Sequence, residues 1–295
     1  MKLKSTLENY LFVLPAVSIF SVFYLIPFLW VFRLSFYEWN GIDLSPTLIY
    51  FSNFKEVLGD KFWWQSLRNA GYITLIALTF QNALAFLLAW ACDREIRMKN
   101  FYRVIFFIPP VLSEIVVGMV WRYLLNSSTL DGANLLNRML IGLGLPQLVH
   151  NWLSDPAVAL TTVAMVHSWK GFGWGFLIFL AGLQTIPKEL YEAARVDGAN
   201  AWESFRKITI PLMVPVIILV GILTVLGTMQ AFALIIGLVG GELGGYTSVP
   251  VLRILSAMRG SSRFGYACAL GINFGLILVI ISFIQYRFSK RSRDI

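Results

Sequence analysis

The chain has 295 residues, of which 57% are hydrophobic and only 14% are charged, and its mean hydropathy is +0.70. An ordinary soluble domain carries roughly 25% charged residues, so this composition excludes a soluble globular protein. The net charge of +8 suggests a nucleic-acid partner, but in a membrane chain the position of the basic residues matters more than their sum. The sequence predicts an all-α integral membrane protein that lies in the lipid bilayer and binds no nucleic acid.

Six stretches are long and apolar enough to cross a bilayer as helices. A hydrocarbon core about 30 Å thick needs about 20 residues of α-helix. The predicted spans are 11–32, 71–92, 104–125, 157–183, 212–239 and 265–286. The first resembles a signal peptide, but its small-residue triplet Ala16–Ser18 comes too early in the apolar run for a cleavage site, so we expect a retained anchor.

The basic residues divide unequally between the two sides of the membrane. Fourteen fall in segments on the side of the N-terminus and eight in segments on the other side. The positive-inside rule therefore places both termini of this multi-pass protein in the cytoplasm. We divide the chain into a tip and first helix at 1–34, an outer loop at 35–65, a core at 66–286 and a basic cytoplasmic tail at 287–295.

Local signals predict irregularities within this plan. The pair Pro109 and Pro110 removes two backbone donors and should kink or break the third span near its cytoplasmic start. Glycines at 171, 173 and 175 let another helix or a ligand approach the fourth span. Turn-rich sequence predicts a partly helical outer loop at 126–156, and apolar residues at near-helical spacing predict a short amphipathic helix within 240–264.

A polar stretch, PKELYEAARVDGANAWESFRKITIP, interrupts the apolar sequence at residues 187–211. Pro187 suits the first turn of a short helix, and Gly198 tolerates the left-handed conformation that ends it. Asn200 followed by Glu203 predicts the cap of a second short helix, after which Pro211 starts the next span. The first helix presents two alanines between acidic residues, so we expect a compact cytoplasmic knob that enters a groove of a partner.

Motifs for catalysis are missing from the chain. It has two histidines, no HExxH, no GxSxG and no GxxxxGK[ST], so it cannot hold ATP phosphates in a Walker-type loop. Cys92 and Cys268 lie far apart in the sequence, and neither belongs to a pattern with metal-ligand spacing. We therefore predict no catalytic residue, no metal site and no cofactor in this chain; if it moves solute by ATP, a partner hydrolyses the ATP.

The polar stretch resembles the EAA motif of permease subunits of ATP-binding-cassette (ABC) importers. The motif begins with Glu192-Ala193-Ala194, and Gly198 follows after three intervening residues. Nine further residues separate Gly198 from Ile208, and one residue separates Ile208 from Ile210–Pro211. Only Ile210 departs, where the family usually has Leu. GLQTIPKELYEAARVDGA at 182–199 and FGYACAL at 264–270 are similar to the MalF-type sugar permeases, and the resemblance covers roughly 66–286. GGELGGYT at 240–247 replaces the usual Gly-Gly-Pro turn.

The resemblance implies a MetI-like type I importer permease with six transmembrane helices in a bacterial cell membrane. It implies four kinds of partner: a second homologous permease, two ABC ATPase subunits that carry ATP and Mg, an extracytoplasmic solute-binding protein, and a saccharide. The EAA loop at 187–211 is then the ATPase-coupling element. Its implied coupling residues are Glu189, Glu192, Ala193, Ala194, Asp197, Gly198, Ile208 and Pro211.

The resemblance also places a sugar pathway along the fourth and fifth spans. It implies substrate-binding residues at His167, Lys170, Gly171 and Trp174, and at Thr224, Gly227, Thr228 and Ala231. Each set follows the i, i+3, i+4, i+7 spacing of one helical face. Aromatic rings, hydroxyls and amides are suitable groups for holding a sugar.

Lys170 allows two interpretations, because an ammonium inside a membrane helix costs on the order of 3 kcal/mol or more unless it is paired or faces water. It forms an ion pair with Glu114 of the third span, or it meets an anionic sugar, together with His167. Three other classes stay open: an importer permease for amino acids or peptides, an ion-coupled secondary transporter that uses Lys170 and Glu114, and a membrane enzyme, which the missing nucleophiles and acids disfavour.

Overall fold

The computed structural model describes residues 2–93, 98–126, 134–240 and 245–291. The chain forms two compact units, one of residues 1–61 with 254–277 and the other of residues 62–253 with 278–295. Helices α14 (Pro250–Arg259) and α15 (Phe264–Arg291) each contribute to both units. Helix α14 matches the amphipathic helix expected within 240–264, whereas residues 241–244 of the GGELGGYT segment lie outside the described residues.

Among the described residues, five helices are long and apolar enough to cross a membrane, and a bent pair brings the number to six. The single helices are Tyr10–Leu34, Lys61–Asp93, Ala159–Leu183, Ala201–Met229 and Phe264–Arg287, and the bent pair is Asn100–Val111 with Glu114–Leu125. Each predicted span therefore has a counterpart, and the all-α membrane class is confirmed. The second and sixth helices run past the predicted ends because charged residues at their tips are as helical as the apolar middle.

The first unit begins with one long helical run and continues into a short β-hairpin. Helices α1 (Lys2–Phe20) and α2 (Ile26–Leu34) join through the π-helical segment η1 (Ser21–Leu25), and strand β1 (Tyr37–Glu38) pairs antiparallel with β2 (Thr47–Leu48). Helix α3 (Ser52–Gly59) follows. Every residue of the 10–34 run is exposed or only partly buried within the unit, which is typical of a helix surrounded by lipid.

Polar contacts fix the loop region of this unit. The buried side chain of Asn53 donates to the carbonyls of Ser35 and Tyr37 at 3.0 Å each. Arg263 donates to both carboxylate oxygens of Glu56 at 2.6 Å, and this bond raises the pKa of the Arg263 guanidinium above its ordinary value. The pair is about half exposed, so it positions the loops more than it stabilises the fold.

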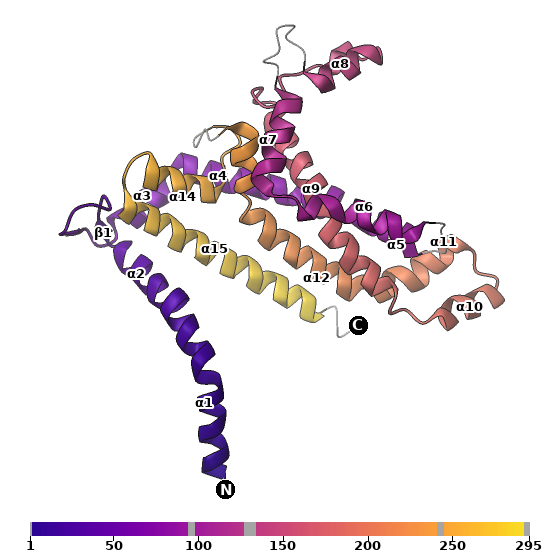
Figure 1. The fold of residues 1–295 in the computed structure, drawn as a ribbon, viewed down its shortest axis with the longest axis horizontal. Helices are drawn as coiled ribbons and strands as arrows, with labels where there is room; N and C mark the ends of the chain where they lie inside the picture. The colour runs from indigo at the N-terminus through magenta and orange to yellow at the C-terminus, as the bar shows by residue number, and fades with distance from the viewer. Residues whose placement is uncertain (1, 94–97, 127–133, 241–244, 292–295) are drawn as a thin grey trace. The chain divides into compact units, whose positions relative to one another are not determined.

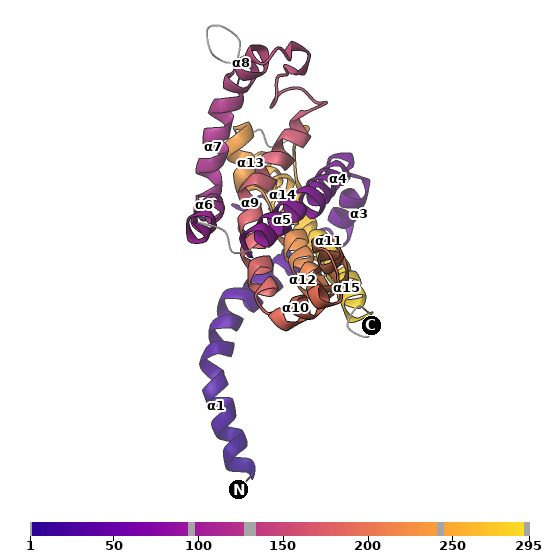
Figure 2. The same ribbon diagram turned by 90° about the vertical axis from the view of Figure 1, so that its right-hand side faces the viewer.

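The second unit is a helical bundle with α9 (Ala159–Leu183) at its centre. Helix α9 contacts α5 (Asn82–Asp93), α6 (Lys99–Val111) and α12 (Ile210–Met229) (Figures 1 and 2). Helix α4 (Lys61–Ile76) runs into α5 through the π-helical segment η2 (Ala77–Gln81). A buried cluster joins these helices, made of Ala85, Phe86, Ala89, Cys92, Phe172, Phe176, Phe179, Leu180, Leu183, Ile186, Met213 and Val220.

The third span is broken at a right angle. Pro109 and Pro110 occupy the last turn of α6, which ends at Val111, and α7 (Glu114–Leu125) starts in a direction 94° away. The predicted break is confirmed. Two adjacent prolines leave the preceding turn without two hydrogen bonds, so the chain can change direction there at low cost.

The prediction for the fifth span was too long. Helix α12 ends at Met229, and residues 233–239 form a separate short helix, α13 (Ala233–Val239), packed on α7. At this crossing a Cβ atom added to Gly118 would lie 2.8 Å from the backbone nitrogen of Leu238, so the two helices touch backbone to backbone. Hydropathy alone cannot separate a membrane span from a short apolar helix that is buried against a neighbour.

Helix α8 (Leu135–Gly142) and helix α10 (Lys188–Val196) lie at opposite ends of this unit in both views (Figures 1 and 2). Helix α8 lies within the loop predicted to face outward, and α10 within the loop predicted to face the cytoplasm. Their separation along the bundle is what that topology requires.

We predict that Gly173→Ala destabilises the protein by about 1–3 kcal/mol, because the added methyl would overlap the side chain of Pro110 and the carbonyl of Phe106 where α6 crosses α9. Thermal unfolding of the detergent-solubilised protein measures the change. Gly71→Ala is the matched control, since no atom lies within 4 Å of the added carbon there. A melting temperature for Gly173→Ala equal to that of the control would contradict the close crossing.

Candidate functional site

The knob between the fourth and fifth spans begins with a short helix that ends in a Schellman motif. Helix α10 covers Lys188–Val196, so Pro187 precedes the helix by one residue instead of lying in its first turn. The amide of Ala199 donates to the carbonyl of Ala194 at 2.8 Å, and that of Gly198 to Arg195 at 3.1 Å. Gly198 has φ +82° and no atom within 4 Å of an added Cβ atom, so this glycine is required by conformation and not by space.

The second part of the knob is not a separate short helix. Asn200 and Glu203 form the predicted capping box, with the Asn200 side chain accepting from the amides of Trp202 and Glu203. From there α11 (Ala201–Ser204) continues through the π-helical segment η4 (Phe205–Thr209) into α12. Pro211 therefore lies within a continuous helix and does not start it. The wider π turn relieves the clash that a proline ring makes with the preceding turn.

The knob has an outward face and an anchored face. The predicted coupling residues Glu189, Glu192, Ala193, Asp197, Gly198 and Pro211 are exposed, and Ala194 and Ile208 are half-buried. On the anchored side, the hydroxyl of Tyr191 shares a hydrogen bond of 2.9 Å with that of the buried Thr209. Phe205 packs on Trp90 and Phe86, next to the buried cluster of the bundle. The anchored face therefore ties α10 and the segment before α12 to the bundle through packed side chains.

Apolar side chains on the outward face were missed in the sequence. Val196 is 88% exposed, Trp202 is 65% exposed and Leu190 is 42% exposed. Apolar residues inside a charged loop of a membrane chain are a sequence signal for a binding surface, because neither lipid nor a protein core covers them there. They extend the polar coupling surface with an apolar area that a partner protein can bury.

Within the bundle, Lys170 of α9 forms an ion pair with Glu114, the first residue of α7. The Lys170 Nζ lies 3.2 Å from Glu114 Oε1, and the lysine side chain is 12% exposed against 42% for the glutamate. The ion-pair interpretation is confirmed in its geometry. It also gives the break in the third span a fixed partner on the fourth, since α7 starts at the residue that Lys170 holds.

The other predicted substrate residues of α9 differ in their surroundings. His167 is half-buried. Trp174 is 56% exposed and packs edge to face on Phe107 at 5.4 Å. Gly171 is covered: a Cβ atom there would lie 2.7 Å from the side-chain oxygen of Gln81. The four residues share a helical face, but in this structure that face is not open along its length.

Of the predicted set at the fifth span, Thr224 and Thr228 bond to the second span, and Ala231 lies beyond the end of α12 at Met229. Thr224 donates to the side-chain oxygen of Asn82 at 3.1 Å, and Thr228 shares a bond of 2.7 Å with Thr74. Gly227 is exposed with nothing within 4 Å of an added Cβ atom, and Ala231 is buried. The assignment of all eight residues to a substrate stays a prediction.

Sequence reasoning overlooked the polar residues of the second span. Thr74, Gln81 and Asn82 lie within the second span, and each meets a residue of the predicted pathway. A polar side chain within a membrane helix is costly unless it has a partner or a function, and this was the signal that could have found them.

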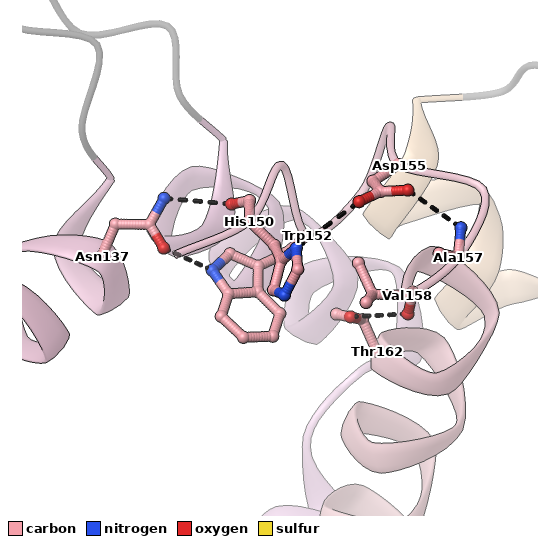
Figure 3. Close-up of polar contacts among 7 residues, drawn as sticks. All are labelled: Asn137, His150, Trp152, Asp155, Ala157, Val158 and Thr162. Carbon is pink, nitrogen blue, oxygen red and sulfur yellow. Dashed lines mark hydrogen bonds and ion pairs between the residues drawn. The ribbon is translucent and has the colours of Figure 1, made fainter. Parts of the chain in front are cut away.

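The loop beyond the end of α7 is folded by asparagine side chains. Asn137 donates to the carbonyl of His150 at 3.0 Å and accepts from the indole of Trp152 at 2.7 Å (Figure 3). His150 Nδ1 lies 3.5 Å from a carboxylate oxygen of Asp155 (Figure 3). Asn134 caps α8 by accepting from the amide of Asn137. The prediction that this loop is partly helical is confirmed, and side-chain hydrogen bonds fix its shape.

The sequence and the structure were compared with known proteins. A model of the family described as "Binding-protein-dependent transport system inner membrane component" matches residues 81–294. A probable ABC transporter permease protein of Bacillus subtilis, YurN, is 30% identical over 287 residues, with 97% of each chain covered. The lactose transport system permease protein LacF of Rhizobium radiobacter is 28% identical, covering 97% of this chain and 95% of its own.

Solved structures share the fold. A chain of a bacterial alginate ABC transporter, in complex with an alginate pentasaccharide-bound periplasmic protein, has a TM-score of 0.80 at 23% identity and covers 98% of this chain and 96% of its own. A chain of the MetNI methionine ABC transporter in an inward-facing conformation has a TM-score of 0.56 at 15% identity, covering 82% of this chain and 98% of its own.

We predict that Gly198→Ala loosens the end of α10, whereas Gly198→Asn does so much less, because asparagine tolerates the left-handed conformation that costs alanine about 1 kcal/mol. Hydrogen exchange at the amides of 198 and 199, measured in detergent, should be about fivefold faster in the alanine variant than in the asparagine variant. Gly142→Ala, at a glycine with negative φ and open space, serves as the control. Equal exchange in all variants would show that the glycine conformation does not hold the turn.

Proposed function

This chain belongs to the family of binding-protein-dependent transport system inner membrane components, and from this premise we propose that it is the permease of an ATP-driven importer whose cargo is a saccharide. It is a multi-pass membrane protein of an ABC transporter. The partners are a second homologous permease, two ABC ATPase subunits that hold ATP and Mg, and an extracytoplasmic solute-binding protein. The chain carries no catalytic group of its own, and its termini face the cytoplasm of a bacterial cell.

The observation that carries the coupling role is the two-sided knob at residues 187–211. Its outward face offers acidic, small and apolar side chains to a groove, and its inner face is bonded to α12 through Tyr191 and Thr209. An ATPase that closes on the outward face moves α10, and the bond and the packed Phe205 transmit that movement to the spans. Rocking of the spans between inward-open and outward-open states then moves the solute.

Support for a saccharide comes from the relatives. Lactose, starch degradation products and arabinooligosaccharides appear in the names of permeases 26–29% identical to this chain over nearly all of its length. The predicted pathway on α9 and α12 contains Trp174, Lys170, His167 and two threonines, residue types that suit the rings and hydroxyls of a sugar. Amino-acid or peptide cargo and ion-coupled transport are the alternatives; uptake that persists when the ATPase partner is inactivated would favour the latter.

We predict that Glu192→Lys abolishes co-purification with the ATPase subunits and reduces ATP-dependent uptake at least tenfold, because it reverses a charge on the exposed coupling face. Uptake into proteoliposomes is measured with lactose, a malto-oligosaccharide, an arabino-oligosaccharide and an alginate oligosaccharide, each with the cognate binding protein. Asp43→Lys, a charge reversal at an exposed position of the 35–65 loop, should leave ATPase association unchanged. Normal association of the Glu192→Lys variant would remove the coupling role from α10.

A second experiment separates the two roles of Lys170. Lys170→Met leaves the Glu114 carboxylate unpaired, so we expect a loss of about 1–2 kcal/mol in stability, discounted because Glu114 is 42% exposed. The double variant Lys170→Met with Glu114→Gln should recover the melting temperature. If the recovered variant transports neutral saccharides normally but no longer transports the alginate oligosaccharide, Lys170 also binds anionic cargo; unchanged uptake of both makes the ion pair structural.

A further inference from the structure

Gln81 of the second span fills a notch in the predicted sugar-facing side of α9. It is the last residue of the π-helical segment η2, and its side chain lies on Gly171. A Cβ atom at position 171 would lie 2.7 Å from the Gln81 oxygen and 3.0 Å from its carboxamide carbon. Any residue other than glycine would therefore push the carboxamide away. The notch and the glutamine fit each other, although they are 90 positions apart in the sequence.

The sequence neighbours of Gln81 and Gly171 make polar contacts between spans. Gly171 follows Lys170, which holds Glu114, and Gln81 precedes Asn82, which accepts from Thr224. Polar contacts of the fourth span with the third, and of the second span with the fifth, thus begin at the sequence neighbours of Gly171 and Gln81. Such a convergence within membrane helices is characteristic of a solute pathway and not of packing alone.

Gln81 is only 7% exposed, and its side-chain oxygen has no hydrogen-bond partner among the residues that the structure describes. A buried acceptor without a partner costs about 1–3 kcal/mol, which an apolar side chain of similar size at this position would avoid. A residue that only fills space has no need of a carboxamide. The π-helical segment adds to this, because such segments recur where a helix carries a functional side chain.

We propose that Gln81 is a saccharide-binding residue that occupies the notch at Gly171 when no sugar lies against α9. A sugar that enters displaces the side chain from Gly171, and the freed carboxamide donates to and accepts from sugar hydroxyls. The residue thus exchanges a contact with α9 for hydrogen bonds to the cargo. This proposal rests on the proposed function, namely transport of a saccharide along α9 and α12.

The test uses the complete transporter in proteoliposomes and whichever member of the four-saccharide panel the wild type takes up. Gln81→Leu should raise the KM for uptake roughly tenfold, as expected for the loss of one hydrogen-bonded contact, while the rate at saturating sugar changes less than twofold. Its melting temperature should not fall. The control is Thr79→Val, a substitution at an exposed residue of the same π-helical segment, and it should leave KM unchanged.

Monodeoxy derivatives of the transported sugar identify the contact. For the derivative that lacks the contacted hydroxyl, wild type and Gln81→Leu should have the same KM, while the other derivatives keep the tenfold difference. A KM for Gln81→Leu within twofold of wild type, or an increase that is equal for every derivative, overturns the proposal and leaves the saccharide function intact. If Gln81→Leu fails to fold, Gln81→Met gives the same readout. A wild type that takes up no saccharide overturns the proposed function itself.

Discussion

The absence of water from the hydrocarbon core governs how this chain is built, because every polar group within a membrane helix must find its partner in the protein. Lys170 of the fourth span is held by Glu114 of the third, and Thr228 and Thr224 of the fifth span are held by Thr74 and Asn82 of the second. These bonds do more than satisfy their own groups. They fix which helices are neighbours, since each residue has a partner on one particular helix. Gln81 of the second span and Ser168 of the fourth depart from this pattern, because a buried side-chain oxygen of each has no hydrogen-bond partner among the described residues.

Close backbone contact gives the bundle its second constraint. The two halves of the broken third span are attached to different helices: α6 crosses α9 at Gly173, and α7 crosses α13 at Gly118. Lipid offers no hydrophobic force to hold helices together, so packing at small residues takes its place. Because the third span is broken at Pro109 and Pro110, its two halves can each cross a different helix. The Lys170–Glu114 pair lies at the start of the second half, α7.

In the coupling role proposed for the knob, force from outside the membrane enters at the end of the bundle that carries α10. The knob combines a stiff turn at Gly198, a capped helix start at Asn200 and a bond between Tyr191 and Thr209, and these features suit it to move together with α12 in that role. A flexible loop in this place would absorb the displacement. The continuity of α11, η4 and α12 has the same effect, because a helix transmits an axial push that a hinge at Pro211 would lose.

Features that depend on local patterns and on charge could be predicted from the amino-acid order. These are the existence of the six spans, the break at the two prolines and the capping box of the knob, with the pairing of Lys170 and Glu114 as one of two interpretations. Each follows from neighbouring residues or from the cost of a charge in lipid. Only the folded bundle shows which apolar helices are long enough to span the membrane and which pack on a neighbour, as α13 packs on α7. It also shows which polar groups of different helices meet. Thr74 and Thr228 are 154 residues apart, and Gly171 is covered by Gln81 of another span. Such contacts depend on the rotation and crossing angle of whole helices, and hydropathy contains no information on either.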